Sequence, residues 1–191
     1  MRSLRRSAAH AGFTLIELVV TMALAIVFLV VAVPSMQDFM ASQQVAATAT
    51  SLQTAAMQAR SRAMQDNRRV MVQPFCHPDT ASCSSPPAWA DGWQVYVDVV
   101  VDQSYQAGTD TLVATEAAAP SGVTVTKESG TNDYFAYDGS GFLASIGGSS
   151  NARWKIASSK TSRIRCMYIE RSGRVRIFDP NPSTTCPTST S

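Results

Sequence analysis

The sequence has very little of what catalysis requires. Its 191 residues include only two histidines, and only one of them, His77, lies beyond the first 12 residues. Aspartates and glutamates are scattered without evident pairing, and neither a glycine-rich phosphate-binding loop nor a serine nucleophile elbow is present. We therefore expect a protein that is not an enzyme and that needs no cofactor.

Charge is nearly absent from the run between Phe13 and Val33, where Glu17 is the only charged residue. About 20 apolar residues in a helix match the hydrocarbon core of a bilayer. No acidic residue precedes this run, but three arginines do: Arg2, Arg5 and Arg6. By the positive-inside rule, the N-terminus then stays in the cytoplasm. We predict a transmembrane helix segment over residues 13–36, with the rest of the chain beyond the membrane.

Two simpler explanations of this run were weighed. A secretory signal peptide has a shorter apolar region of about 7–15 residues with its cleavage site after that region, whereas the Gly12–Phe13 junction precedes the run. A plain membrane anchor fits the length but gives no reason for Glu17, because a charged side chain in the bilayer costs about 2.5–3.5 kcal/mol. The carboxylate therefore points to a function of its own.

The residues around this carboxylate resemble a known signature. Gly12-Phe13-Thr14-Leu15-Ile16-Glu17-Leu18 is similar to the prepilin motif of type IV pilins and type II secretion pseudopilins. The resemblance implies that residues 1–12 are a leader peptide, that a prepilin peptidase cleaves after Gly12, and that the new amine of Phe13 is methylated. It also implies that Glu17 pairs with the terminal amine of a neighbouring subunit in a filament.

The same resemblance implies a location and a set of partners. The chain would first cross the bacterial inner membrane once, with its N-terminus in the cytoplasm and its globular domain in the periplasm. It would then enter an extracellular type IV pilus. Its partners would be the prepilin peptidase and other pilins.

Helical periodicity continues well past the apolar run. Apolar residues recur at alternating spacings of four and three: Val45, Ala49, Leu52, Ala56, Ala59 and Ala63. Such a stripe is typical of a helix that lies on another element. A helix from Phe13 to Met64 or Asp66 would be about 80 Å long, with Pro34 where pilins often have a helix-loosening proline. A free coiled coil is the alternative, but its core positions favour residues larger than alanine.

Beyond Asn67 the apolar pattern changes to a period of two. Segments of this kind, bounded by Gly, Ser, Asn or Asp, are 70–75, 93–99, 112–115, 123–126, 134–137, 154–157, 164–169 and 174–178. They predict an antiparallel sheet, with Pro74 placing the first strand at an edge and the tail 179–191 as coil. Together with the prepilin resemblance, this gives an α+β, type IV pilin-like fold. Its long helix has an amphipathic half, ending near residue 66, that packs on the sheet of a globular domain at 37–191.

All four cysteines lie beyond the apolar run, which favours two disulfides in an oxidising compartment, with three possible connectivities. Proximity in sequence favours Cys76–Cys83 and Cys166–Cys186. A zinc site is the alternative. The spacings are irregular, however, and His77 has no second histidine near it, so we expect no metal.

A second resemblance covers the globular part of the chain. The stretch from Trp89 to Tyr96, W-A-D-G-W-Q-V-Y, is similar to the W-x-x-G-W-x-V-F stretch of the GspH/FimT family of minor pilins. Residues 134–141 resemble the strand and turn that precede the C-terminal part of that family. The simplest role of the aromatic side chains is core packing, which we expect for Trp89, Trp93, Tyr96 and Phe135.

Positive charge is missing from one half of the globular part and concentrated in the other. Between Met71 and Ser150 the only base is Lys127, against nine acidic residues. Between Asn151 and Phe178 the only acid is Glu170, against eight bases: Arg153, Lys155, Lys160, Arg163, Arg165, Arg171, Arg174 and Arg176. A basic segment on an acidic domain focuses positive potential in one place, as expected for a polyanionic partner.

The stretch Gly173-Arg174-Val175-Arg176 makes this expectation more specific. In a strand, its two arginines would face the same side about 6.6 Å apart, where each can grip a phosphate. Gly173 permits a tight turn. The stretch resembles the G-R-x-R motif of FimT-type minor pilins, which in some bacteria bind DNA during natural transformation. The alternative is a solvated edge strand that is basic to avoid aggregation.

We therefore predict a minor pilin that binds double-stranded DNA without sequence specificity. The expected DNA-binding residues are Gly173, Arg174, Arg176, Arg171, Arg165, Arg163 and Lys160. The alternative function is structural: a minor pilin or pseudopilin that primes or caps a filament.

Overall fold

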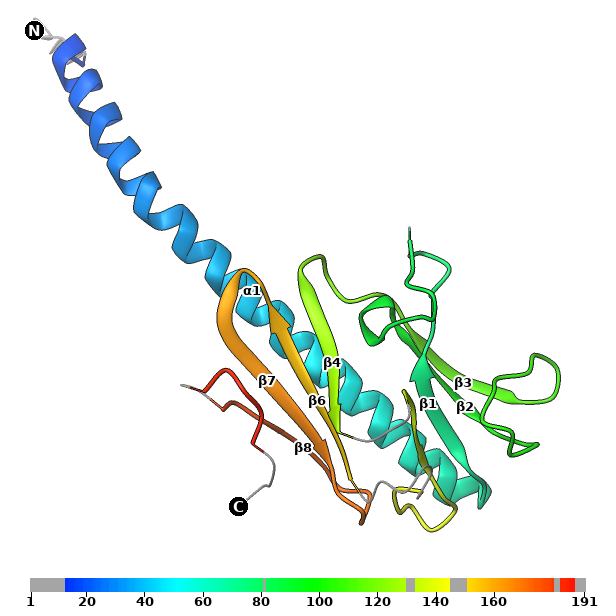
Figure 1. Ribbon diagram of the computed structural model, residues 1–191. Helices are drawn as coiled ribbons and strands as arrows, with labels where there is room; N and C mark the ends of the chain where they lie inside the picture. Colours follow the sequence, from blue (N-terminus) through cyan, green and yellow to red (C-terminus); the bar gives the residue numbers. More distant parts are fainter. Residues whose placement is uncertain (1–12, 81, 130–132, 145–150, 181–182, 188–191) are drawn as a thin grey trace, which may run out of the picture. The chain divides into compact units, whose positions relative to one another are not determined.

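A long helix, α1 (Leu15–Asp66), opens the chain in the computed structural model, which describes residues 13–80, 82–129, 133–144, 151–180 and 183–187 (Figure 1). The chain divides into two compact units, residues 1–37 and 38–191, and α1 contributes to both.

Local chemistry explains where α1 begins and ends. The hydroxyl oxygen of Thr14 accepts the backbone N–H of Glu17 at 3.2 Å, which satisfies one of the free donors of the first turn. At the other end, Asn67 has φ 49°, and the N–H of Arg68 donates to the carbonyl oxygen of Ala63 at 3.2 Å. A left-handed asparagine with this hydrogen bond is a common helix stop. The predicted end at Asp66 is confirmed.

The first unit holds the apolar half of α1. Phe13 and Glu17 are exposed at its start, and the helix continues through position 34 without interruption. Over the part of the chain that the structure describes, no helix combines the length and apolarity of a membrane-crossing segment. The span predicted at 13–36 therefore stays a prediction. Gly12 and the rest of the predicted leader lie outside the described residues.

The second unit contains two antiparallel four-stranded sheets. The first has the order β3-β2-β1-β5, with β1 (Val70–Pro74), β2 (Trp93–Val97), β3 (Thr111–Glu116) and β5 (Phe135–Tyr137). The second has the order β4-β6-β7-β8, with β4 (Val123–Ser129), β6 (Ala152–Ser158), β7 (Thr161–Ile169) and β8 (Val175–Phe178). Every predicted strand is present, and the predicted α+β arrangement of a long helix packed on antiparallel sheets is confirmed. The division into two sheets, and the short 3-10 helix η1 (Trp89–Asp91), were not predicted.

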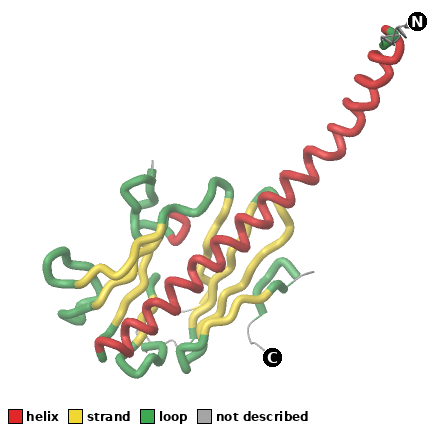
Figure 2. The backbone as a smooth tube through the Cα atoms, turned by 180° about the vertical axis from the view of Figure 1, so that it is seen from behind, coloured by secondary structure: helices red, strands yellow, loops and turns green. Residues whose placement is uncertain are grey.

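The core lies between the two sheets and the part of α1 beyond Asp38, which crosses one face of both sheets (Figure 2). The whole predicted stripe from Val45 to Ala63 is buried, and its alanines let the strands approach the helix closely. Trp89, Trp93 and Phe135 are buried in the same core, where Trp89 stacks on Phe135 with ring centroids 5.8 Å apart. Tyr96 is buried in a smaller cluster with Met71 and Ala136.

This core belongs entirely to the second unit. Every buried hydrophobic residue among the described ones lies at or beyond Ala41. A unit that carries its own core has what independent folding requires, so residues 38–191 can be studied as a separate domain.

The prediction that Pro74 places its strand at an edge is wrong. β1 is an inner strand, with β2 on one side and β5 on the other. The register explains why proline is tolerated there. β5 pairs only with Val70, Met71 and Val72, so no neighbouring strand on that side requires the missing N–H of Pro74.

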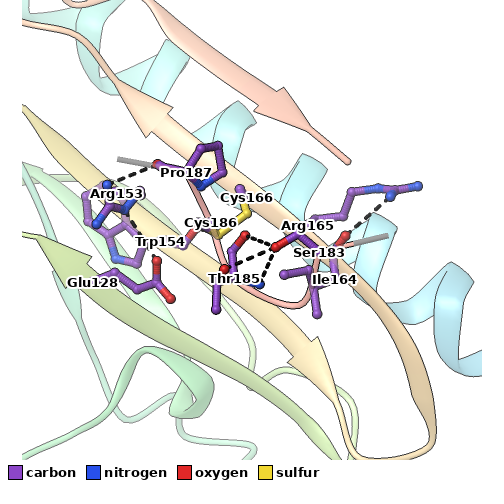
Figure 3. Close-up of a disulfide and its surroundings, with 10 residues drawn as sticks. All are labelled: Glu128, Arg153, Trp154, Ile164, Arg165, Cys166, Ser183, Thr185, Cys186 and Pro187. Carbon is purple, nitrogen blue, oxygen red and sulfur yellow. Dashed lines mark hydrogen bonds and ion pairs between the residues drawn. A yellow bond between two sulfur atoms is a disulfide. The ribbon is translucent and has the colours of Figure 1, made fainter. Parts of the chain in front are cut away.

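Both predicted disulfides are present, Cys76–Cys83 and Cys166–Cys186, with Cα–Cα distances of 5.8 and 5.7 Å. All four cysteines are therefore used, which removes the zinc alternative. Figure 3 shows how the second disulfide holds the C-terminal segment against β7. The segment is also bonded to β6, because the carbonyl oxygen of Pro187 accepts a hydrogen bond of 3.1 Å from Arg153. The described residues of the tail form neither helix nor strand, as expected.

Candidate nucleic-acid interface

The predicted DNA-binding residues do not form one cluster, because β7 separates them. Lys160 lies in the β6–β7 hairpin and Arg163 near the start of β7, whereas Arg171, Gly173 and Arg174 lie in the turn after β7. From Arg163 to the end of β7 at Ile169 the strand runs for six steps, a distance of about 20 Å at 3.3 Å per residue. Figure 1 shows the hairpin and the turn at opposite ends of the second sheet.

The β7–β8 turn has a tight and well-bonded backbone. The N–H of Gly173 donates to the carbonyl oxygen of Glu170, and the N–H of Glu170 donates to that of Arg174, both at 2.9 Å. Gly173 has φ 79°, which side-chain-bearing residues rarely adopt. A Cβ at this position would lie 2.0 Å from the carbonyl oxygen of Gly141. Only glycine lets the turn approach the 138–143 loop this closely.

Arg60 of α1 joins the turn to that loop. Its Nε donates to the carbonyl oxygen of Gly141 at 3.0 Å, and its Nη2 donates to that of Ser172 at 3.1 Å. A third bond runs directly from the N–H of Leu143 to the carbonyl oxygen of Arg171 at 3.0 Å. Helix, loop and turn are therefore one hydrogen-bonded assembly. Because Arg60 bonds only to neutral carbonyl groups, it also adds a positive charge at the turn.

Three of the eight bases between Asn151 and Phe178 form ion pairs with acidic side chains. Arg153 pairs with Glu128 at 3.3 Å, Arg176 pairs with Glu170 at 3.2 Å, and Arg165 pairs with Asp179. The Arg153 pair is drawn in Figure 3, beside the second disulfide.

By contrast, Lys160, Arg163, Arg171 and Arg174 are exposed, and none has an acidic partner among the described residues. These four are the fully exposed cations of the segment, whereas Lys155 on β6 is half-buried and also has no acidic partner among the described residues.

The expected pair of equivalent arginines on one strand is wrong. β8 begins at Val175, so Arg174 belongs to the turn and Arg176 to the strand. Arg176 is half-buried and pairs with Glu170, six residues away in the sequence. Its cross-strand partner in the hairpin is Tyr168, so the ion pair runs diagonally between the two strands. Val175 and Ile177 pack against the core. Of the two arginines in the Gly173–Arg176 stretch, Arg174 is thus the exposed one. Arg171 is the other exposed arginine of the turn.

The acidic half of the domain contributes no cation to its surface. Its single base, Lys127, is half-buried, with its ammonium 5.8 Å from the centre of the Trp154 ring. Burial lowers the pKa of this ammonium, and nearby Asp133 partly opposes that effect. The 71–150 segment therefore offers little positive charge at the surface of the domain.

Arg60 was missed in the sequence because it lies in the amphipathic helix, far from the basic segment along the chain. Only the hydrogen bond to Ser172, 112 residues away, reveals its role. No feature of the helical pattern distinguishes it from Arg62, which pairs locally with Asp66 at 2.7 Å.

No arrangement of the described residues suits a metal: groups of three or more histidine, cysteine, aspartate or glutamate side chains placed to bind one are absent there. His77 lies instead beside Asp79, with 3.4 Å between its Nδ1 and the carboxylate.

Comparisons with known proteins agree with this architecture. The family model described as type II transport protein GspH matches residues 48–173, about two thirds of the chain. No curated protein matches the sequence.

Among solved structures, the type IV minor pilin FimU of Pseudomonas aeruginosa is similar, with a TM-score of 0.55 and 19% identity over 77% of this chain and 95% of FimU. The minor pseudopilin EpsH of the Vibrio cholerae type 2 secretion system has a TM-score of 0.50 and 12% identity, over 72% and 98% of the two chains. At these identities the structural likeness establishes the fold, and the family model establishes kinship. The chain therefore belongs to the GspH family and has the fold of a type IV minor pilin or pseudopilin.

Proposed function

We propose that this protein is a minor pilin of a type IV pilus that binds double-stranded DNA through the β7–β8 turn and supports DNA uptake in natural transformation. The observation that carries the proposal is the turn itself. Arg171 and Arg174 are exposed there without an acidic partner in the described part of the chain, on a backbone held by α1 and the 138–143 loop.

The arrangement suits phosphate and not base recognition. Arginine binds phosphate oxygens with its planar fork and keeps its charge at any physiological pH. A turn is too short to enter a groove as a helix or a two-stranded ribbon does. Contacts to phosphates position DNA but carry no direct sequence information. The protein would therefore accept any sequence.

Arg176 has a supporting role in this proposal. Its pairing with Glu170 fixes both side chains beside the turn, and the two charges largely cancel. Arg165 is similarly neutralised by Asp179, and Lys160 and Arg163 lie at the far end of β7. We therefore assign DNA binding to Arg171, Gly173 and Arg174, with Arg60 positioning them.

The N-terminal segment has its own proposed role in assembly. We infer cleavage by a prepilin peptidase after Gly12, N-methylation of Phe13, and residence in the inner membrane through residues 13–36 before incorporation into the filament. The exposed carboxylate of Glu17 would then meet the terminal amine of a neighbouring pilin. Glycine-to-valine substitution at Gly12 should leave full-length precursor, whereas Glu17→Ala should permit cleavage but reduce incorporation into pili.

The test of DNA binding uses residues 38–191, the unit with its own core. Fluorescence anisotropy with unrelated duplexes should give similar affinities in the micromolar range, falling steeply with salt because bound phosphates release counterions. Combining Arg171→Ala with Arg174→Ala should weaken all duplexes equally and reduce the magnitude of the log–log salt slope by about two, one per lost phosphate contact. Transformation should fall while pili still assemble.

Unchanged affinity and an unchanged salt slope in this double variant would contradict the proposal. The purely structural function, priming or capping of a pilus or a type II secretion pseudopilus, would then account for the family and the fold.

A further inference from the structure

We propose that Phe142 is a stacking platform for an unpaired nucleobase, so that the interface holds single strands and frayed duplex ends more tightly than intact duplex. This inference rests on the proposed DNA binding and adds a class of ligand to it. The side chain of Phe142 is 51% exposed, although both of its neighbours, Gly141 and Leu143, are buried.

Phe142 lies directly beside the basic turn. Gly141 before it contacts Gly173 and accepts the hydrogen bond from Arg60, and Leu143 after it donates to the carbonyl oxygen of Arg171. Both neighbours of the aromatic residue are thus bonded or packed to the assembly that carries the exposed arginines. A strand whose phosphates meet Arg171 and Arg174 would bring its bases to this position.

The backbone of Phe142 is fixed on both sides. Its N–H donates to a carboxylate oxygen of Asp138 at 3.1 Å, and its carbonyl oxygen accepts the N–H of Asp138 at 3.0 Å. The same carboxylate oxygen accepts the N–H of Ser140 at 2.9 Å. A ring on so rigid a loop loses little conformational freedom when a base stacks on it.

The charges around the ring favour a nucleic acid over an apolar protein partner. Arg60, Arg171 and Arg174 contribute cations. Two nearby acids are neutralised in ion pairs, Glu170 with Arg176 and Asp66 with Arg62. The carboxylate of Asp138 keeps its charge, but it accepts backbone N–H groups of its own loop. Among the described residues, Met64 is another exposed large apolar side chain against this loop, at 49%. Aromatic rings set among cations are the usual means of binding single strands without sequence preference.

The test separates stacking from charge. Wild-type 38–191 is titrated with an oligothymidine strand, with an abasic strand of the same length, and with a duplex. Because stacking on an aromatic residue contributes about 1–3 kcal/mol per base, oligothymidine should bind at least about 5-fold more tightly than the abasic strand. Phe142→Leu, which keeps an apolar side chain but removes the ring, should abolish that preference and leave abasic-strand and duplex affinities unchanged.

Phe142→Trp supplies a rescue and a second readout. It should restore the preference, and its exposed indole should be quenched by oligothymidine but not by the abasic strand, whereas Trp89, Trp93 and Trp154 are buried. Equal binding of both strands by the wild type, or a preference that survives in Phe142→Leu, overturns the inference and leaves duplex binding intact. If Phe142→Leu instead reduces only incorporation into pili, the ring contacts a protein and the inference is overturned. Absence of binding to all three probes overturns the proposed function as well.

Discussion

The two ends of β7 carry the same number of exposed cations but hold them in different ways. At the hairpin end, Lys160 and Arg163 depend on local bonds, from the N–H of Lys160 to Ser158 and from the N–H of Arg163 to Thr161. At the turn end, Arg171 and Arg174 sit on a backbone bonded to residues of α1 and of the 138–143 loop. Charge alone does not distinguish the ends, whereas long-range fixation of the backbone does.

If the turn binds DNA as we propose, this difference would explain why one end of the basic segment does so and the other does not. A flexible cation contributes to the field that attracts a polyanion. A cation on a fixed backbone can also keep its fork in the geometry that a phosphate requires. The comparison predicts that substitutions at the turn, or at the groups that fix it, have larger effects than equal changes of charge elsewhere.

The largest effect is expected from Gly173→Ala, with Gly108→Ala as its control. Both glycines have positive φ, but a Cβ at Gly108 meets nothing within 4 Å, whereas a Cβ at Gly173 lies 2.0 Å from the oxygen of Gly141. The conformational term is about 1–2 kcal/mol in both, and the clash adds about 1–3 kcal/mol at Gly173. Chemical denaturation of the two variants measures the difference. Equal losses would show that the turn can move away from the loop without cost.

A smaller effect should separate the two pairs of cations. Arg171→Ala with Arg174→Ala should weaken duplex binding about 100-fold or more, because each of the two lost charge-assisted hydrogen bonds contributes roughly 1.5–3 kcal/mol. Lys160→Ala with Arg163→Ala removes the same net charge and should weaken it less than about threefold, through the long-range field alone. Anisotropy at one fixed salt concentration compares the variants. Similar losses for both pairs would mean that DNA follows the whole segment.

Substitutions of Arg60 test whether fixing the backbone of the turn matters for DNA binding, because they leave Arg171 and Arg174 in place. Arg60→Lys keeps the charge but loses the fork that bonds both Gly141 and Ser172, so it should weaken DNA binding about as much as Arg60→Ala, by roughly 1 kcal/mol, the net contribution of a typical hydrogen bond. Hydrogen exchange at Leu143 should accelerate in both variants. Full recovery of affinity in the lysine variant would assign Arg60 a direct charge contact instead.

The smallest effect is expected from Glu170→Gln, which releases Arg176. An ion pair this exposed stabilises a fold by about 0–1 kcal/mol, so the thermal midpoint should hardly change. One additional cation at the turn should raise duplex affinity about twofold and increase the magnitude of the salt slope by up to one. Glu128→Gln, which releases Arg153 on β6, is the matched control and should leave the duplex affinity and the salt slope unchanged. If Glu170→Gln instead binds duplex DNA more weakly than the wild type, the ion pair itself shapes the turn.

Sequence periodicity was enough to predict α1, the buried stripe from Val45 to Ala63, all eight strands and both disulfides. These features follow from local spacing: three and four for a helix, two for strands, and short separations between paired cysteines. The position of β1 was mistaken because proline restricts only the side of a strand that would need its N–H, and the register of β5 is not a local property.

The candidate site was predicted in part. The motif at Gly173 and Arg174 and the excess of bases after Asn151 are visible in the sequence. Which bases remain available depends on which acids lie opposite them, as the pairs of Arg165 with Asp179 and of Arg176 with Glu170 show. Arg60 and Phe142 were invisible because their importance comes from contacts across the fold.

The bonds from Arg60 also give the turn a mechanical character. If a DNA strand bound at Arg174 were pulled away from the protein, the force would act on β8. This strand is only four residues long and would peel from β7 one hydrogen bond after another. The guanidinium of Arg60 and the Leu143 bond offer a second route for that tension, directly into the helix and the 138–143 loop. Several bonds then share the load and must break together. The anchorage would resist a tug on bound DNA better than the short hairpin alone.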